Sequence, residues 1–175
     1  MTESIIKIKY KMVLFGSEGV GKTSLIHRFV NDKFDADYTT TIGYNIYEKI
    51  INLDRYNISL IIYDFGGQEQ FKSIRRRFSQ GTDIAFLVYD ITDKESFNDL
   101  SKWKFELSDV SNNATFIIVG NKKDLEEERQ VVKKLDKDLI EKLDAINFFE
   151  TSAKTGENVE DAFILLVKET LKRNQ

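Results

Sequence analysis

Apolar residues recur along the chain with two spacings, one typical of strands and one typical of helices. In residues 5–15, apolar positions first alternate with lysines and then become continuous at residues 13–15, which predicts a β-strand. Residues 23–30 instead place their apolar side chains at helical spacing. Short continuous apolar runs at 84–89 and 115–120 are typical of strands buried on both faces of a parallel sheet.

The same reading extends to the rest of the chain. The predicted strands cover residues 5–15, 43–52, 58–64, 84–89, 115–120 and 146–149, and the predicted helices cover residues 23–30, 94–110, 131–143 and 159–171. A turn at 53–57 joins the second and third strands into an antiparallel hairpin. The alternation of strands and helices predicts an α/β fold: a doubly wound, mostly parallel, six-stranded sheet with that hairpin at one edge. Such sheets bind ligands at the carboxyl ends of their strands.

Composition narrows the function classes. The chain has 175 residues, the length of one domain, and 41% of them are hydrophobic while 31% are charged, as in a soluble globular protein. The net charge is −3 and the isoelectric point is about 5.4, which argues against nucleic acid as a partner. We find no signal-peptide pattern and no apolar run of about 18 residues.

Cysteine is absent, which excludes disulfides, thiolate catalysis, prenylation and palmitoylation of this sequence. The start, Met1-Thr2-Glu3, lacks the glycine that myristoylation requires. We therefore expect a cytoplasmic protein with no direct lipid anchor in this chain. Membrane association would need a missing tail or a partner protein.

A phosphate-binding loop follows the first predicted strand. Residues 16–23 read Gly-Ser-Glu-Gly-Val-Gly-Lys-Thr, which fits the pattern G-x-x-x-x-G-K-[ST] between a strand and a helix. Glycines let backbone N–H groups approach phosphate oxygens, and the helix N-terminus adds a partial positive charge. Lys22 should bridge the β- and γ-phosphates, and the Thr23 hydroxyl should bind Mg²⁺. Alone, this motif predicts a nucleoside triphosphate with Mg²⁺, without specifying the base.

A second motif, Asp64-Phe65-Gly66-Gly67-Gln68, follows the third predicted strand. Asp64 is the expected carboxylate on the metal side of such a site. Gly67 can offer its N–H to the γ-phosphate, and the Gln68 amide can orient the attacking water because it both donates and accepts hydrogen bonds. Taken alone, the motif also fits a glycine turn with a capping aspartate.

Two further tetrapeptides end the last two strands and point to guanine. Asp124, in Asn121-Lys122-Lys123-Asp124, can accept hydrogen bonds from the ring N–H and the exocyclic N–H₂ of guanine, a pair that adenine lacks. In Thr151-Ser152-Ala153-Lys154, the Ala153 N–H can meet the guanine O6. The aliphatic stems of Lys122 and Lys154 can cover the base faces.

Together these motifs resemble the signature motifs of Ras-superfamily small GTPases, with Rab-like and Ras-like features, over nearly the whole chain. The resemblance implies a P-loop NTPase G domain spanning residues 1–175, slow hydrolysis of GTP to GDP with Mg²⁺, and two switch segments at 34–43 and 64–77. It further implies that Thr41 binds Mg²⁺ and the γ-phosphate, that Phe34 packs on the guanine, and that Tyr38 closes over the phosphates. The implied protein partners are effectors, exchange factors and activating proteins, which bind through the switch segments.

The expected site residues fall into three groups. The catalytic group comprises Gln68, Lys22, Thr41 and Gly67. The metal ligands are Thr23, Thr41 and Asp64. The nucleotide contacts are Gly16, Glu18, Gly19, Val20, Gly21, Lys22, Thr23, Ser24, Phe34, Tyr38, Thr41, Gly67, Asn121, Lys122, Asp124, Ser152, Ala153 and Lys154.

Three features depart from the family pattern. Glu18 occupies a position that is usually small, so its carboxylate can repel the γ-phosphate, meet an incoming arginine, or point into solvent. Gly66 replaces the usual alanine and should loosen the second switch. No cysteine follows Leu171, so a soluble, non-lipidated lineage such as the archaeal Rab-like GTPases and a truncated chain both fit.

Two alternative functions follow from these observations. A GTP-binding interaction module with little or no hydrolysis would result if Glu18 disabled turnover, although the presence of Gln68 argues against this. A nucleotide kinase is not supported, because the sequence shows no second basic substrate site.

Residues 75–77, three arginines on the helix of the second switch, are expected on a solvated surface, because three adjacent cations cannot share one helix face. Trp103 is expected in the core.

Overall fold

The computed structural model describes residues 4–36, 40–132 and 136–174, without the side chains of 136–138. Its centre is one six-stranded sheet with the order β2-β3-β1-β4-β5-β6. The strands are β1 (Ile6–Phe15), β2 (Tyr44–Leu53), β3 (Tyr56–Phe65), β4 (Ile84–Asp90), β5 (Thr115–Asn121) and β6 (Phe148–Glu150). Only β2 runs antiparallel to its neighbour, and the other pairs are parallel. This is the doubly wound sheet that the sequence predicts.

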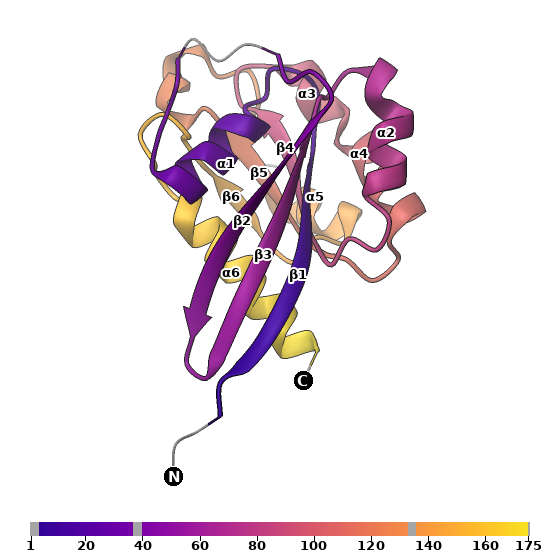
Figure 1. Ribbon diagram of the computed structural model, residues 1–175. Helices are drawn as coiled ribbons and strands as arrows, with labels where there is room; N and C mark the ends of the chain where they lie inside the picture. Colours follow the sequence, from indigo (N-terminus) through magenta and orange to yellow (C-terminus); the bar gives the residue numbers. More distant parts are fainter. Residues whose placement is uncertain (1–3, 37–39, 133–135, 175) are drawn as a thin grey trace.

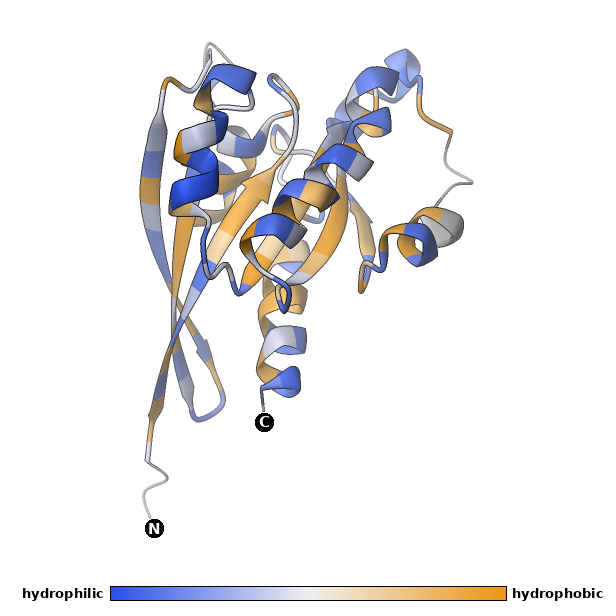
Figure 2. Cartoon of the chain, turned by 90° about the vertical axis from the view of Figure 1, so that its right-hand side faces the viewer, coloured by the Kyte–Doolittle hydropathy of each residue, from blue (hydrophilic) through white to orange (hydrophobic). Residues whose placement is uncertain are grey.

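Helices cover both faces of the sheet (Figure 1). The α-helices are α1 (Lys22–Asn31), α2 (Lys72–Phe78), α3 (Lys94–Asn98), α4 (Leu100–Val110), α5 (Asp136–Leu143) and α6 (Val159–Arg173), and the 3₁₀ helices are η1 (Glu69–Phe71) and η2 (Lys123–Glu128). Helices α1 and α6 pack on one face through a core that includes the stacked rings of Phe29 and Phe163. Helices α2 to α5 pack on the other face, around Trp103 and Leu107. In Figure 2 the strands behind these helices are mainly apolar, which agrees with burial on both faces.

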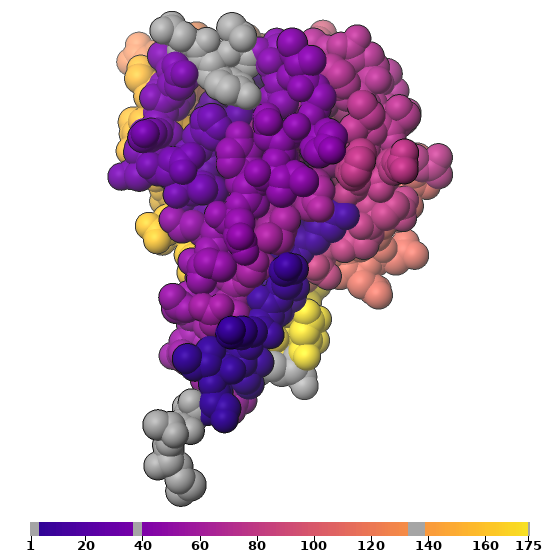
Figure 3. Space-filling model, viewed as in Figure 1, coloured from indigo at the N-terminus to yellow at the C-terminus, as the bar shows by residue number. Residues whose placement is uncertain are grey.

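The β2–β3 hairpin lies at the edge of the sheet, as predicted. Its connection is shorter than the predicted turn, because the strands continue to Leu53 and from Tyr56. Asp54 takes the left-handed conformation that a two-residue hairpin loop requires, with φ of 48°. Figure 3 shows the strands β1, β2 and β3 at the molecular surface, beside helix α2.

Two predicted helices have different limits in the structure. The helix predicted at 94–110 is divided at Asp99 into α3 and α4, and the Asp99 carboxylate accepts a hydrogen bond from the Ser17 hydroxyl at 2.8 Å. The helix predicted from 131 is not helical there: the Val131 N–H donates to the Ile91 carbonyl, and its side chain is buried. Helix α5 is described from Asp136 onward.

The topology brings all four predicted motifs to one end of the sheet. The phosphate loop follows β1, the Asp64 motif lies at the end of β3, and the two base-reading tetrapeptides lie at the ends of β5 and β6. Because the four strands carrying these motifs run parallel, their carboxyl ends meet at the same edge.

Candidate functional site

The loop at residues 16–21 closes tightly around the amino end of α1. Gly21 has a left-handed backbone with φ of 96°, and a Cβ there would lie 2.3 Å from Asn121 Nδ2, so only glycine fits. Lys22 is buried, and its Nζ donates to the carbonyls of Gly16 at 2.6 Å and Ser17 at 2.8 Å. Burial lowers the pKa of Lys22 to about 8, while the nearby Asp64 carboxylate opposes the shift. The ammonium is therefore held close to the loop and is costly to keep charged without an anion.

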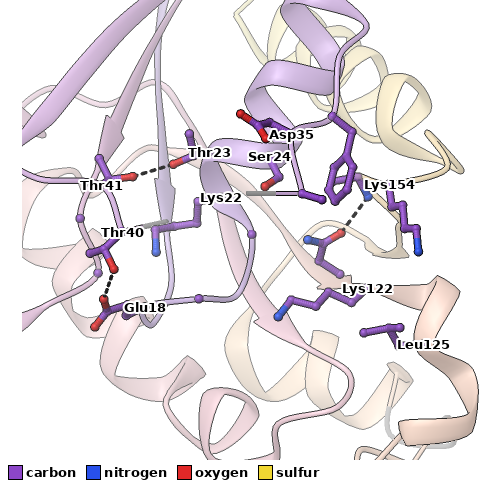
Figure 4. A pocket seen from close by; sticks show the side chains of 18 of the residues that line it. Glu18, Lys22, Thr23, Ser24, Asp35, Thr40, Thr41, Lys122, Leu125 and Lys154 are labelled. Atoms are coloured by element: carbon purple, nitrogen blue, oxygen red, sulfur yellow. Dashed lines mark hydrogen bonds between the residues drawn. The ribbon is translucent and has the colours of Figure 1, made fainter. Parts of the chain in front are cut away.

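Two hydroxyls and one carboxylate meet beside this lysine. Thr23 Oγ1 donates to Asp64 Oδ2 at 2.6 Å and lies 2.8 Å from Thr41 Oγ1 (Figure 4). Asp64 is fully buried, and burial raises its pKa, against the hydrogen bond from Thr23 and the charge of Lys22. Its second oxygen, Oδ1, is buried with no hydrogen-bond partner among the described residues.

An unpaired buried carboxylate oxygen beside two hydroxyls fits a hard divalent cation. Mg²⁺ prefers oxygen ligands and is commonly held by one or two carboxylates together with substrate phosphates. Within the described ranges, no group of three or more His, Cys, Asp or Glu side chains could hold a metal by itself. The donor set of Thr23, Thr41 and Asp64 is therefore chemically suited to Mg²⁺ that is shared with a phosphate ligand.

Asn121 links three loops at the far side of the cavity. Its Nδ2 donates to the Val20 carbonyl at 3.0 Å, and its Oδ1 accepts from the Thr151 hydroxyl and the Ala153 N–H, both at 3.2 Å. The Ala153 N–H, predicted to meet a base oxygen, is thus already engaged in one long hydrogen bond. Asn121 sets the spacing between the phosphate loop and the two tetrapeptides.

Asp124 is exposed, and the Ser152 hydroxyl donates to its Oδ1 at 2.5 Å. Ser152 in turn accepts from the Thr155 N–H at 3.1 Å, so the carboxylate is oriented by the following loop. Lys122 Nζ pairs with Asp90 Oδ2 at 2.6 Å, which extends the lysine stem along the cavity wall. These contacts fix both side chains before any ligand is present.

A single cavity of about 700 Å³ contains most of the predicted residues. Those that line it are Glu18, Gly19, Gly21, Lys22, Thr23, Ser24, Phe34, Thr41, Gly67, Asn121, Lys122, Asp124, Ala153 and Lys154. Gly16, Val20, Asp64, Gln68 and Ser152 lie behind or beside this lining; the Val20 side chain belongs to the core. Tyr38 lies outside the described residues.

Sequence reasoning missed several residues of the lining. Asp35, Ala36, Thr40, Gly66, Phe65 and Leu125 also border the cavity. Each of them lies one or two positions from Phe34, Thr41, Asp64 or Asp124 in the sequence. Extending the predicted motifs by two residues would therefore have included them.

Glu18 does not point freely into solvent, although it is exposed. Its Oε1 accepts from Thr40 Oγ1 and from Gln68 Nε2, both at 2.8 Å. These two hydrogen bonds, Thr40 first, lower the pKa of Glu18. The Oε1 atom of Gln68 accepts from Gln70 Nε2 at 2.5 Å. The reading that Glu18 is exposed to solvent is therefore consistent with the structure, and the carboxylate in addition bonds to both switch segments.

Arg75 is buried, with an exposed fraction of 1%, which corrects the expectation that residues 75–77 all lie on a solvated surface. Its guanidinium forms two hydrogen bonds with the Glu106 carboxylate, at 2.9 and 3.1 Å, and lies over the ring of Trp103. Its Nη1 donates to the carbonyls of Gly66 and Gln68. Arg75 thus fixes the backbone on both sides of Gly67.

Among the residues that the structure describes, no helix is both long and apolar enough to cross a membrane.

Comparison with known proteins gives consistent matches over nearly the full chain. A sequence model of the Ras family matches residues 11–172. The Ras-related protein Rab-4B of Homo sapiens is 38% identical over 165 residues, which cover 94% of this chain and 77% of the relative. The Ras-related proteins Rab-4A of Homo sapiens and of Bos taurus are each 39% identical over 165 residues, covering 94% of this chain and 75% of the relative.

Proposed function

Because this chain belongs to the Ras family of small GTPases and hydrolyses GTP to GDP, we propose that it is a Mg²⁺-dependent switch whose segments 34–43 and 64–77 are ordered by the γ-phosphate. The observation that carries this proposal is the arrangement of Asp64. Its unpaired oxygen lies in a buried site beside Thr23, Thr41 and the ammonium of Lys22. A buried carboxylate oxygen without a partner and a buried ammonium are costly unless a cation compensates the first and an anion compensates the second.

Thr23, Thr41 and Asp64 would hold the magnesium ion, which would neutralise charge on the phosphates. The loop would bind the phosphates through its backbone N–H groups and Lys22. The contributing residues are Gly16, Glu18, Gly19, Val20, Gly21, Lys22, Thr23 and Ser24. The loop is already closed around Lys22, so little reorganisation is needed and the phosphates are held by positioning and charge.

Gln68 would orient the attacking water, and the N–H groups of Thr41 and Gly67 would contact the γ-phosphate. A water oriented by Gln68 needs the carbonyl of its amide as an acceptor. That oxygen accepts a hydrogen bond from Gln70 in this structure and keeps a second lone pair for the water. The lack of an arginine among the described residues that line the cavity supports slow intrinsic hydrolysis.

Guanine would be read by Asp124, whose carboxylate is positioned by Ser152 to accept two hydrogen bonds. The Ala153 N–H would be shared between Asn121 and the guanine O6. Phe34 and the stems of Lys122 and Lys154 border the same part of the cavity and would cover the base. Binding would also bury Asp124, which makes a mismatched base costly.

Effectors, exchange factors and activating proteins would bind at the switch segments. Ile42 has an exposed fraction of 85%, and Tyr44 and Ile46 on the adjoining β2 are also exposed. An exposed apolar group next to the first switch supports a protein partner rather than nucleic acid. We place this activity in the cytoplasm, in membrane traffic or signalling, with residues 1–175 forming one G domain.

Mg²⁺ dependence of GDP binding tests this proposal directly. We expect wild-type protein to bind GDP at least about ten-fold more tightly with Mg²⁺ than with a chelator, and Asp64→Asn to lose most of that difference. Asp54→Asn is the matched control: it makes the same change at the hairpin turn, where asparagine is equally suited. Mg²⁺-independent affinity in wild type, or an Asp64→Asn protein with an unchanged Mg²⁺ response, would contradict the assignment.

A further inference from the structure

One carboxylate oxygen connects the phosphate loop with both switch segments. Glu18 Oε1 accepts a hydrogen bond from the Thr40 hydroxyl, shown in Figure 4, and another from the Gln68 amide. Thr40 directly precedes Thr41, and Gln68 directly follows Gly67. Glu18 therefore holds the neighbour of each switch residue that is proposed to contact the γ-phosphate, Thr41 and Gly67.

The backbone of Glu18 also packs closely against the second switch. A Cβ on Gly67 would lie 2.6 Å from the Glu18 nitrogen, so the second switch rests directly on the phosphate loop. The Gly66 N–H donates to the Gly43 carbonyl at 3.2 Å, which joins the end of the first switch to the second. These contacts join the phosphate loop to the second switch and the second switch to the first.

The hydrogen bonds that Glu18 accepts also determine the orientation of Gln68. The amide nitrogen points to Glu18, while the amide oxygen accepts from Gln70. Because both ends of the amide are engaged, the side chain of Gln68 is fixed on the loop side of the second switch.

We propose that Glu18 is a positioning residue that tethers both switch segments to the phosphate loop without requiring the γ-phosphate. The proposal rests on the proposed switch function. In a small GTPase, loss of the γ-phosphate releases the two segments. Here the Glu18 carboxylate supplies an anionic acceptor that stays in place after hydrolysis. The GDP form therefore keeps part of these contacts between the loop and the switches, and the difference between the GTP and GDP forms is smaller than in a protein without this carboxylate.

Hydrogen exchange of the full chain, measured by mass spectrometry on peptides covering 40–44 and 66–71, tests the tether. We compare wild type with Glu18→Ala, each loaded with GDP and Mg²⁺. Loss of two charge-assisted hydrogen bonds should accelerate exchange by about five-fold in both peptides. Glu127→Ala, at an exposed glutamate on η2, is the matched control and should leave both peptides unchanged.

Two conservative variants separate the tether from a general loosening of the fold. Glu18→Gln keeps an acceptor oxygen without the charge, so it should recover part of the wild-type protection. Thr40→Val removes only one donor and should accelerate the first peptide more than the second. Because Glu18 is exposed, the melting temperature of Glu18→Ala should match that of wild type. Equal exchange in wild type and Glu18→Ala, or no recovery by Glu18→Gln, would overturn the proposal.

The same comparison in nucleotide-free protein keeps the tether distinguishable from the switch function. The contacts of Glu18 do not involve a nucleotide, so Glu18→Ala should accelerate exchange in both peptides there as well. If wild type failed to bind GDP, the proposed function would fail while this comparison still decided the tether. If GDP bound normally and the nucleotide-free proteins exchanged alike, the tether alone would fail.

Discussion

The buried ammonium of Lys22 gives the site a pH dependence. Burial lowers its pKa to about 8 in the free protein, and phosphates should raise it again because they favour the charged form. Below about pH 8 the group is charged before and after binding, so affinity is flat. Above it, binding takes up a proton, and the GDP dissociation constant should rise by up to about ten-fold per pH unit.

Calorimetry in buffers with different ionisation enthalpies measures this proton directly. We expect near-zero proton uptake on GDP binding at about pH 7 and a clear fraction of one proton at about pH 8.5. Equal uptake at both pH values would show that the pKa of Lys22 is not lowered in the free protein.

Base recognition depends on the acceptor character of Asp124. In Asp124→Asn, one acceptor oxygen becomes an N–H₂ donor that faces the donors of guanine, so GDP affinity should fall by at least about 10²-fold. The variant should gain affinity for xanthosine diphosphate, whose base offers an acceptor at that position. Competition binding measures both effects, with Asp144→Asn as a control at an exposed site. Undiminished preference for GDP would exclude Asp124 as the base reader.

Among the structural elements, α2 is held to α4 by the buried ion pair of Arg75 with Glu106, whereas the pair of Arg76 with Asp109 is exposed. Removing Arg75 would leave the Glu106 carboxylate and the carbonyls of Gly66 and Gln68 without their partner. Breaking a buried pair in this way costs about 3–5 kcal/mol, which corresponds to a melting temperature roughly 10 °C lower for Arg75→Met.

Arg77→Met provides the comparison for that variant, since Arg77 is exposed on the same helix and should shift the melting temperature little. Arg75→Met combined with Glu106→Leu should recover part of the loss, because no unpaired charge remains. Equal melting temperatures for Arg75→Met and Arg77→Met would contradict the assigned role of Arg75.

The elements and the site were predictable from the sequence to different degrees. The presence and order of the strands and the phosphate loop follow from local patterns, such as the apolar runs of β4 and β5, whereas the limits of the hairpin strands and of β6 differ from the prediction. The choice of Arg75 over its two neighbours does not, because it depends on how α2 is rotated against α4. Asp99, at the break between α3 and α4, likewise bonds to Ser17, which lies 82 residues away in the sequence. The hydrogen bonds of Glu18 could not be predicted from the sequence, because they depend on how the two switch segments lie around the phosphate loop.

For the whole molecule, ligand binding should appear as stability. A ligand that binds only the folded chain adds about 4 kcal/mol at 1,000 times its dissociation constant. We therefore expect GDP with Mg²⁺ to raise the melting temperature by roughly 10 °C, a chelator to reverse much of that shift, and ADP to have little effect. Thermal melts with the three additions measure this. Similar shifts from GDP and ADP would contradict guanine selectivity of the cavity.

Single-turnover hydrolysis of bound GTP in the presence of Mg²⁺ tests the central claim most directly. Wild type should hydrolyse slowly, and Gln68→Leu should be at least about ten-fold slower because it cannot orient the water. Gln80→Leu, an equivalent change at an exposed residue beyond the end of α2, should match wild type. If wild type and Gln68→Leu hydrolysed bound GTP at the same rate, Gln68 would have no part in the reaction, and the account of this site as a hydrolytic switch would be contradicted.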